Sequence, residues 1–311
     1  MRRPDLACVG ELMVDVHVGV PLPPPGGRAH GAITLLPGGS AVTAALAARR
    51  AGGTVLVVGR VGDDAGGRLL VDALAEHRVE THVGRTPDRP TGVCVYAGGA
   101  VAAERGANRG VRPEDLPAVL VAGAVLVSGY LLLQPDSAEA GRAALARAEA
   151  RWRAVDAASA ELVRRGGLEA EGANVVLADA EEARALTGEE DEEAAVRALA
   201  ERFELALVKL GARGALACSH GDLVRHAEPP VDRLAAAGTG DAFAGATLLA
   251  LARGDGLESA IVAGCRAGAA QAAGGGLGRS DPIQLPADAF ERDRDPLGWR
   301  DQADEEDAWR G

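Results

Sequence analysis

Aromatic side chains and lysine are scarce in this sequence. Phe, Trp and Tyr together make 3% of its 311 residues, so aliphatic side chains and alanine must fill the core. Few aromatic rings also disfavour the base-stacking platforms of single-stranded nucleic-acid binders. The chain has 33 basic residues, yet Lys209 is the only lysine among them. An amine kept at one position in an arginine-rich chain suggests a local need for it.

Signals for secretion, membrane insertion and disulfide bonding are also missing. No basic-plus-apolar segment opens the chain, and no apolar run reaches the roughly 18 residues of a membrane span. Cys8, Cys94, Cys218 and Cys265 show no C-x-x-C spacing, which predicts reduced core thiols and a cytoplasmic protein. The net charge of −12 disfavours nucleic acid and anionic membranes as partners.

The common motifs of nucleotide and metal enzymes do not occur. The sequence has no G-x-x-x-x-G-K-[ST], no G-x-G-x-x-G after its first strand pattern, no H-E-x-x-H and no G-x-S-x-G. P-loop, dinucleotide-binding, zinc-protease and nucleophile-elbow chemistries are therefore disfavoured. The six histidines lack the spacing of metal ligands.

Apolar strand patterns alternate with helical patterns along most of the chain. Continuous apolar runs such as LACVG at 6–10 and TVLVV at 54–58 are typical of a parallel sheet covered on both faces. Short strands at 11–20 and 32–36, and a hairpin around Gly98-Gly99, interrupt this alternation. We expect these segments, 11–37 and 90–107, to form a small β lid that projects from one large α/β domain.

A glycine turn followed by an acid precedes an apolar helix expected over Ala242–Arg253. Gly238 and Gly240 permit backbone conformations in which successive N–H groups point into one concavity, and a helix start adds its own N–H groups and dipole. Such a site binds phosphate oxygens. Asp241, in the first turn, is placed to act as a base beside it. The alternative interpretation is an acid that only caps a packed helix.

The order of further motifs completes the pattern. VGELMVD ends at Asp15, Gly38-Gly39 precedes a helix, and GRVGDDAGGRLL follows at 59–70. PTG at 90–92, RGAN at 105–108, ADAEEARALTG at 178–188 and VKLGARG at 208–214 precede the glycine turn. Over roughly residues 6–280 this order resembles the PfkB carbohydrate kinase family of ribokinase-like sugar kinases.

The resemblance implies a fold and a reaction. The fold would be a mainly parallel twisted sheet with helices on both faces and a β-sheet lid, over residues 1–290, followed by a charged tail at 291–311. The reaction would transfer the γ-phosphoryl group of ATP to a hydroxyl of a small carbohydrate. Asp241 would be the general base, and Gly238, Thr239 and Gly240 would form the anion hole. The substrate would be bound by Asp15, Gly38, Gly39, Thr43 and Asn108.

The resemblance also implies sites for the nucleotide and for Mg²⁺. Lys209, Gly211 and Gly214, together with Gly238 and Gly240, would line the nucleotide. Asp179, in place of the family's asparagine, and Glu182 would hold Mg²⁺ through water, although an acidic, solvated helix start explains them equally well.

Two departures from the family pattern bear on ions and specificity. Ala235, Ala236 and Ala237 replace the signature's leading aspartate and the two positions after it, which puts activation by K⁺ in doubt. Thr43 stands where the sugar loop often has asparagine, which weakens a ribose-type specificity. Exposed edges of the lid strands would allow a homodimer.

Two other functions stay open. The first is a nucleoside kinase of the same fold, which ranks below a sugar kinase because no aromatic cluster is evident near the lid and Tyr96 and Tyr130 are the only tyrosines. The second is a non-catalytic nucleotide or sugar sensor, suggested by Ala235–Ala237.

Overall fold

The computed structural model describes residues 3–24, 26–227 and 237–275. Its main body is built on a nine-stranded sheet of order β15-β14-β13-β12-β11-β9-β1-β4-β5, in which β14 alone runs against the other strands. In chain order the strands are β1 (Leu6–Val9), β4 (Val55–Gly62), β5 (Glu80–Thr86), β9 (Ala124–Ser128), β11 (Trp152–Asp156), β12 (Val175–Asp179), β13 (Leu205–Lys209), β14 (Ala215–Ser219) and β15 (Asp222–His226).

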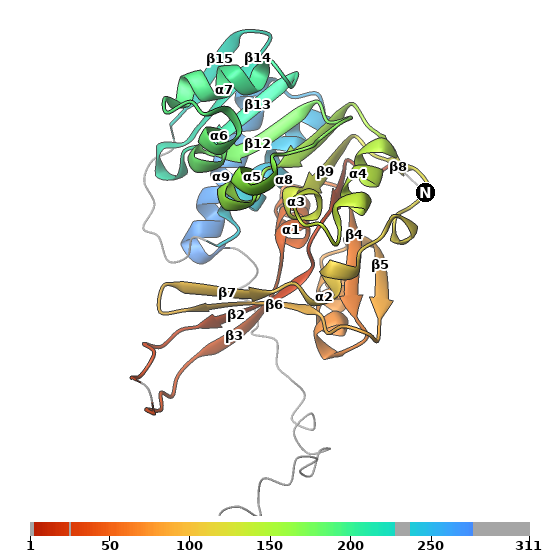
Figure 1. Cartoon of the computed structure of the whole chain (residues 1–311), viewed down its shortest axis with the longest axis vertical. Helices are drawn as coiled ribbons and strands as arrows, with labels where there is room; N and C mark the ends of the chain where they lie inside the picture. The colour runs from red at the N-terminus through yellow and green to blue at the C-terminus, as the bar shows by residue number, and fades with distance from the viewer. Residues whose placement is uncertain (1–2, 25, 228–236, 276–311) are drawn as a thin grey trace, which may run out of the picture.

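Helices cover both faces of this sheet, so the central strands are buried on both sides (Figure 1). Alternate residues of β1 show the division, because Leu6 and Cys8 belong to one core cluster and Ala7 and Val9 to the other. The first cluster includes residues of α1 (Ser40–Arg50), α2 (Ala65–Glu76), α8 (Thr239–Ala252) and α9 (Leu257–Ala270). The second includes residues of α3 (Gly129–Leu133), α4 (Ala138–Ala146), α5 (Ala160–Gly166), α6 (Ala180–Thr187) and α7 (Glu192–Ala200).

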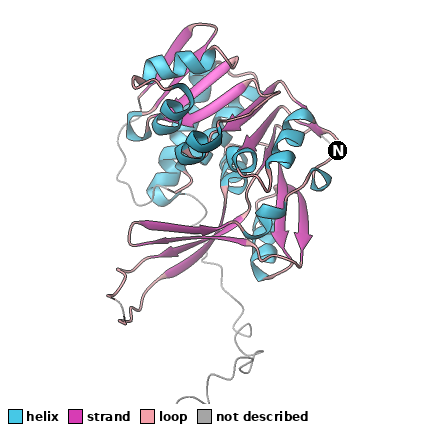
Figure 2. Ribbon diagram, viewed as in Figure 1, coloured by secondary structure: helices cyan, strands magenta, loops and turns pink. Residues whose placement is uncertain are grey.

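A separate four-stranded sheet, which we call the lid, projects from the main body (Figure 2). Its order is β3-β2-β6-β7, with β2 (Met13–Val18), β3 (Ile33–Gly38), β6 (Gly92–Ala97) and β7 (Ala100–Glu104). The expected architecture, a mainly parallel sheet with a small β-sheet lid, is confirmed. A two-residue pairing of β8 (Leu120–Val121) with β10 (Ala148–Glu149) completes the strands of the described chain.

Some local elements differ from expectation. The helix expected from Ala242 begins at Thr239, because Gly238 has a φ of 71° and ends the preceding turn as the N-cap. Strand β5 and helix α5 are not evident in the sequence pattern. The first is a largely exposed, polar edge strand, and the second has only seven residues. The tail at 291–311 lies outside the described residues. None of the helices in the described chain is long and apolar enough to cross a bilayer.

Candidate active site

A cavity of about 410 Å³ opens where the carboxyl ends of the parallel strands meet the start of α8. Ligands gather at this edge of open α/β sheets because the strand ends and helix starts converge there. Ser128, Asp156, Asp179 and Lys209 each end a strand and line the cavity. The strand order β9-β11-β12-β13 therefore brings four polar side chains from distant parts of the sequence to one place.

The glycine turn at the start of α8, residues 238–241, contains the residues predicted to form an anion hole, and we call it the anion cradle. The first helical hydrogen bond runs from the Ala242 N–H to the Gly238 carbonyl, at 2.9 Å, so the amides before Ala242 have no helical acceptor. A Cβ on Gly238 would lie 2.8 Å from Thr43 Cγ2, and one on Gly240 would lie 3.1 Å from Lys209 Nζ. Both glycines are therefore needed for close packing, and Thr43 lies against the cradle.

Asp241 lines the cavity from the first turn of α8. Its pKa is raised to about 7: burial is the largest cause, Asp156 and Glu11 also raise it, and Lys209 opposes them. A carboxyl with a pKa near neutrality can accept a proton from a hydroxyl and release it again at physiological pH. The geometry is thus compatible with the predicted general base, and that role stays a prediction.

Lys209 forms a buried ion pair with Asp156. Its Nζ lies 2.8 Å and 3.1 Å from the two carboxylate oxygens, and both side chains are largely buried. Although burial opposes the charged amine, Asp156 and Glu182 raise the pKa of Lys209 above its usual range, so it is a permanent cation. Asp156 was missed by the sequence reasoning because it ends a strand without any motif around it.

The two predicted magnesium residues cap helix α6. The Glu182 N–H donates to Asp179 Oδ1 at 2.8 Å, and the Asp179 N–H donates to Glu182 Oε2 at 2.7 Å, which is a capping box. Both residues also line the cavity, and burial raises the pKa of Glu182 to about 7.

The donor chemistry of this pair suits magnesium held through water. Carboxylate oxygens are hard ligands, and Mg²⁺ keeps several waters when it binds a nucleotide. Within the described ranges no three His, Cys, Asp or Glu side chains gather closely enough to hold an ion by themselves. Asp179 and Glu182 therefore fit an ion carried mainly by phosphates.

The predicted nucleotide glycines lie beside Lys209, in the turn after β13. Gly211 and Gly214 have φ angles of 62° and 86° and line the cavity. A Cβ on Gly214 would lie 1.9 Å from the His226 carbonyl oxygen, so the end of β15 can approach only because this residue is glycine. The wall of the cavity at Gly211 and Gly214 is therefore formed by backbone, without side chains.

The predicted substrate residues Asp15, Gly38 and Gly39 come together at the base of the lid. A Cβ on Gly38 would lie 2.2 Å from the Asp15 carboxyl, and one on Gly39 would lie 2.4 Å from the Glu11 carbonyl oxygen. Burial, with a contribution from Asp241, raises the pKa of Asp15 to about 7. The Asp15 carboxyl therefore senses the charge of Asp241 across the space between lid and cradle.

Asn108 has a different environment. It is fully buried, its Oδ1 accepts from the Leu12 N–H at 3.0 Å, and its Nδ2 donates to the carbonyls of Leu12 and Arg105. These bonds fasten η1 (Gly106–Gly110) to the stem of the lid. The structure does not bring Asn108 to the cavity, and its predicted contact with substrate stays a prediction.

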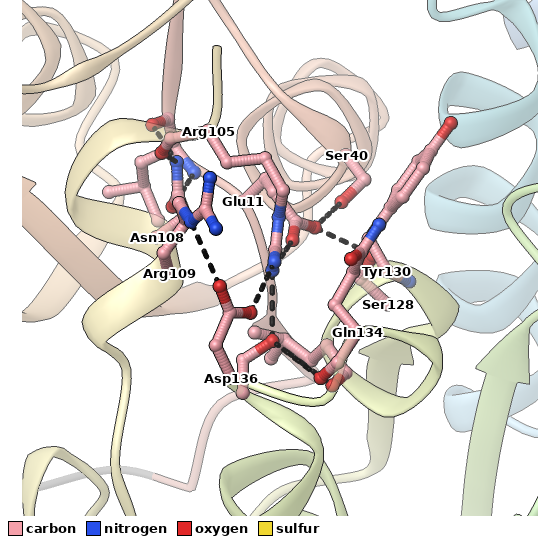
Figure 3. A network of polar contacts seen from close by, with 12 residues as sticks. Glu11, Ser40, Arg105, Asn108, Arg109, Ser128, Tyr130, Gln134 and Asp136 are labelled. Carbon is pink, nitrogen blue, oxygen red and sulfur yellow. Dashed lines mark hydrogen bonds and ion pairs between the residues drawn. The ribbon is translucent and has the colours of Figure 1, made fainter. Parts of the chain in front are cut away.

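A polar network around Glu11 joins the lid to the main body (Figure 3). The buried Glu11 carboxylate accepts from Ser128 at 2.9 Å, from Ser40 at 3.2 Å and from Arg105 at 3.0 Å. Arg105 also pairs with Asp136 at 2.8 Å. Glu11 was not among the predicted site residues, although it lies in the VGELMVD motif. Its partners could not be identified before the fold was known.

Solved structures with the same fold include kinases for sugars and nucleosides. The adenosine kinase of Sinorhizobium meliloti is 22% identical with a TM-score of 0.80, over 93% of this chain and 99% of that one. The Vibrio cholerae O395 fructokinase, bound to fructose, ADP and calcium, is 24% identical with a TM-score of 0.72, over 86% and 92%.

A third structure contains a nucleotide and magnesium. It is a candidate ribokinase II of Escherichia coli in complex with ATP and Mg²⁺, 18% identical with a TM-score of 0.78, over 86% of this chain and 92% of that one. No curated protein sequence matches this chain. The model of the pfkB family carbohydrate kinases matches residues 3–284, nearly the whole sequence. This chain therefore belongs to the pfkB family of carbohydrate kinases.

Proposed function

We propose that this protein is an ATP-dependent kinase that transfers the γ-phosphoryl group to a hydroxyl of a small, sugar-like acceptor. The observation that carries the proposal is the arrangement at the start of α8. There a carboxyl with a pKa near 7, Asp241, adjoins helix N–H groups and the Lys209 cation in one cavity. Phosphoryl transfer needs positioning and positive potential more than covalent chemistry, and this arrangement supplies both.

In the proposed mechanism Asp15 and the Gly38-Gly39 backbone orient the acceptor below the lid. Asp241 takes the proton of the attacking hydroxyl, while the amides of the anion cradle and Lys209 stabilise the charge on the transferred group. Asp179 and Glu182 would hold Mg²⁺ through water, and the ion would supply positive charge at the phosphates. Closure of the lid would exclude water and so suppress hydrolysis of ATP.

Asp241→Asn tests this proposal directly. The amide keeps the size of the side chain but cannot accept the proton, so turnover should fall by about three powers of ten or more while nucleotide binding persists. An ADP-release screen over pentoses, hexoses, ketodeoxy acids, sugar phosphates and nucleosides finds the acceptor. Calorimetric titration with ATP and Mg²⁺ gives the binding control. Near-normal turnover of Asp241→Asn would falsify the assignment of the base.

A nucleoside is the second candidate acceptor, and one observation favours it. His17 and Tyr96 are cross-strand partners on the lid, and their rings stack with centroids 4.6 Å apart. The sequence had suggested no aromatic cluster near the lid, and the structure corrects this. The pair shares a sheet face with Asp15, because side chains two residues apart on a strand point the same way. Protection against thermal unfolding by nucleosides but not by sugars would select this acceptor.

Four further proposals concern the whole protein. A sensor without catalysis would bind ATP yet release no ADP with any acceptor. The argument for it rests on Ala235–Ala237, of which Ala235 and Ala236 lie outside the described residues. The question of whether K⁺ activates the protein rests on the same residues.

We also propose one kinase domain over residues 1–290 and a homodimer through the lid, which sedimentation would test. The buried cysteines, none in a disulfide, fit a cytoplasmic location.

A further inference from the structure

The ion pair of Asp156 and Lys209 is unusual in its position. Asp156 ends β11 and Lys209 ends β13, with β12 between them, so the pair spans the edge of the sheet below the anion cradle. Lys209 Nζ lies 3.1 Å from the position that a Gly240 Cβ would occupy. The ammonium therefore lies beside the cradle at Gly240, where a side chain would press against it.

Burying two charges is costly, and replacing such pairs by apolar side chains is often neutral or stabilising. Stability alone therefore gives little reason for this pair, and its place at the cavity suggests a role in chemistry. An ammonium has three N–H donors, of which the two Asp156 oxygens use two. One donor remains for an anionic oxygen held in the cradle.

Asp241 is surrounded by titratable groups from several elements. The charges of Asp156 and Lys209, at the ends of β11 and β13, and of Glu11, in the segment between β1 and β2, shift its pKa. It acts in turn on other groups of the described chain, namely Cys8 of β1, Asp15 of β2, Tyr96 of β6, Tyr130 of α3 and Lys209. Asp156 and Lys209 are the one pair among these whose opposite charges are in direct contact.

We propose that Asp156 is a positioning residue: it holds the Lys209 ammonium below the anion cradle, where the amine contacts the transferred phosphoryl group, and the two opposite charges act together on Asp241. This inference rests on the proposed kinase function. It gives Asp156 no contact with substrate. It makes the single lysine of the chain part of the phosphate site, with an orientation set by the carboxylate beside it.

The two charges have opposite effects on Asp241, which gives a signed test. Removing the negative charge in Asp156→Asn should shift the acidic limb of the pH profile of kcat/KM to lower pH, by about half a unit or more. Removing the positive charge in Lys209→Met should shift the limb to higher pH. Both variants should raise KM for ATP, since one misplaces the amine and the other lacks it.

Three further variants complete the design. In the double variant Asp156→Asn/Lys209→Met, kcat/KM should fall by less than the product of the two single-variant fold-losses, because the two residues act as a unit. Asp156→Glu keeps the carboxylate, so its KM for ATP should lie between those of the wild type and Asp156→Asn. Glu192→Gln removes an acid that pairs with the exposed Arg213 at 2.8 Å, near the cavity but outside it, and should leave the profile unchanged. Thermal unfolding of each variant monitors folding, and the double variant leaves no unpaired buried charge if a single variant fails to fold.

Shifts of the same sign for both single variants, or no shift beyond that of Glu192→Gln, would overturn the inference. Failure of the kinase proposal gives a different result, namely no release of ADP from the wild-type protein with any acceptor. If Asp241→Asn is inactive and Asp156→Asn keeps the wild-type profile, only the positioning role of Asp156 is wrong.

Discussion

At the scale of single residues, the candidate site contains carboxyls whose pKa values are raised by burial to near neutral pH. Asp15, Glu182 and Asp241 each have a pKa raised to about 7, with desolvation as the largest cause. An acceptor hydroxyl placed between Asp15 and Asp241 would meet one carboxyl that orients it and one that takes its proton.

Asp15→Asn should therefore separate binding from chemistry. The amide can still contact a hydroxyl, but it loses the stronger charge-assisted hydrogen bond, so KM for the acceptor should rise by about tenfold or more. KM for ATP should stay near that of the wild type. Steady-state kinetics with each substrate varied in turn measure both, and an equal rise in the two KM values would contradict an acceptor-binding role.

Local motifs made part of the site predictable. Gly38, Gly39, Asp15 and the anion cradle could be proposed as site residues from the sequence, because each belongs to a short motif with particular backbone demands. Glu11 and Asp156 were not, because their partners are remote. Glu11 contacts residues 29, 94 and 117 positions away, and Asp156 contacts a lysine 53 positions away. Only strand order brings such residues together.

At the scale of elements, helices α1 and α8 pack backbone to backbone. A Cβ on Gly245 would lie 2.0 Å from the Ala44 carbonyl oxygen, so α8 reaches α1 only because this residue is glycine. The contact fixes the start of α8, where Asp241 lies, relative to the Gly38-Gly39 loop before α1. In the proposed mechanism it therefore sets the distance between the acceptor and the base. Helix α1 was predicted with its observed bounds, since two glycines precede an alanine-rich run, whereas its partner could not be inferred.

Gly245→Ala should accordingly destabilise the protein. The added methyl group meets backbone that cannot rotate away, so the free energy of unfolding should fall by about 1–3 kcal/mol. Gly166→Ala is the matched control, because a Cβ there meets no atom within 4 Å. It should change stability by about 0.5 kcal/mol or less. Urea unfolding of both variants checks this, and equal stabilities would contradict the close packing.

At the scale of the whole molecule, the raised carboxyl pKa values predict how stability depends on pH. In the unfolded chain these three groups ionise near pH 4, as model carboxyls do. Between about pH 4 and 7 the folded state therefore binds more protons than the unfolded state, so the stability that these groups contribute falls as pH rises.

The melting temperature of the ligand-free protein should thus decrease from pH 5 to pH 8. Glu182→Gln removes one of these groups yet keeps an oxygen for the Asp179 N–H, so it should flatten the decrease. Calorimetry across the pH range measures both slopes, with Glu192→Gln as a control that removes a half-buried carboxyl whose pKa is lowered by its hydrogen bond to Arg213. A variant slope as steep as that of the wild type would show that Glu182 ionises normally.

The one lysine of the sequence has a practical consequence. Acylating and aldehyde reagents react with uncharged amines, and in this chain they can find one side-chain amine only. In the folded protein that amine is buried, charged and held by Asp156. Covalent modification of Lys209 therefore requires that the ion pair with Asp156 breaks and the amine becomes accessible. The rate of modification at this single side chain would report how often the site opens.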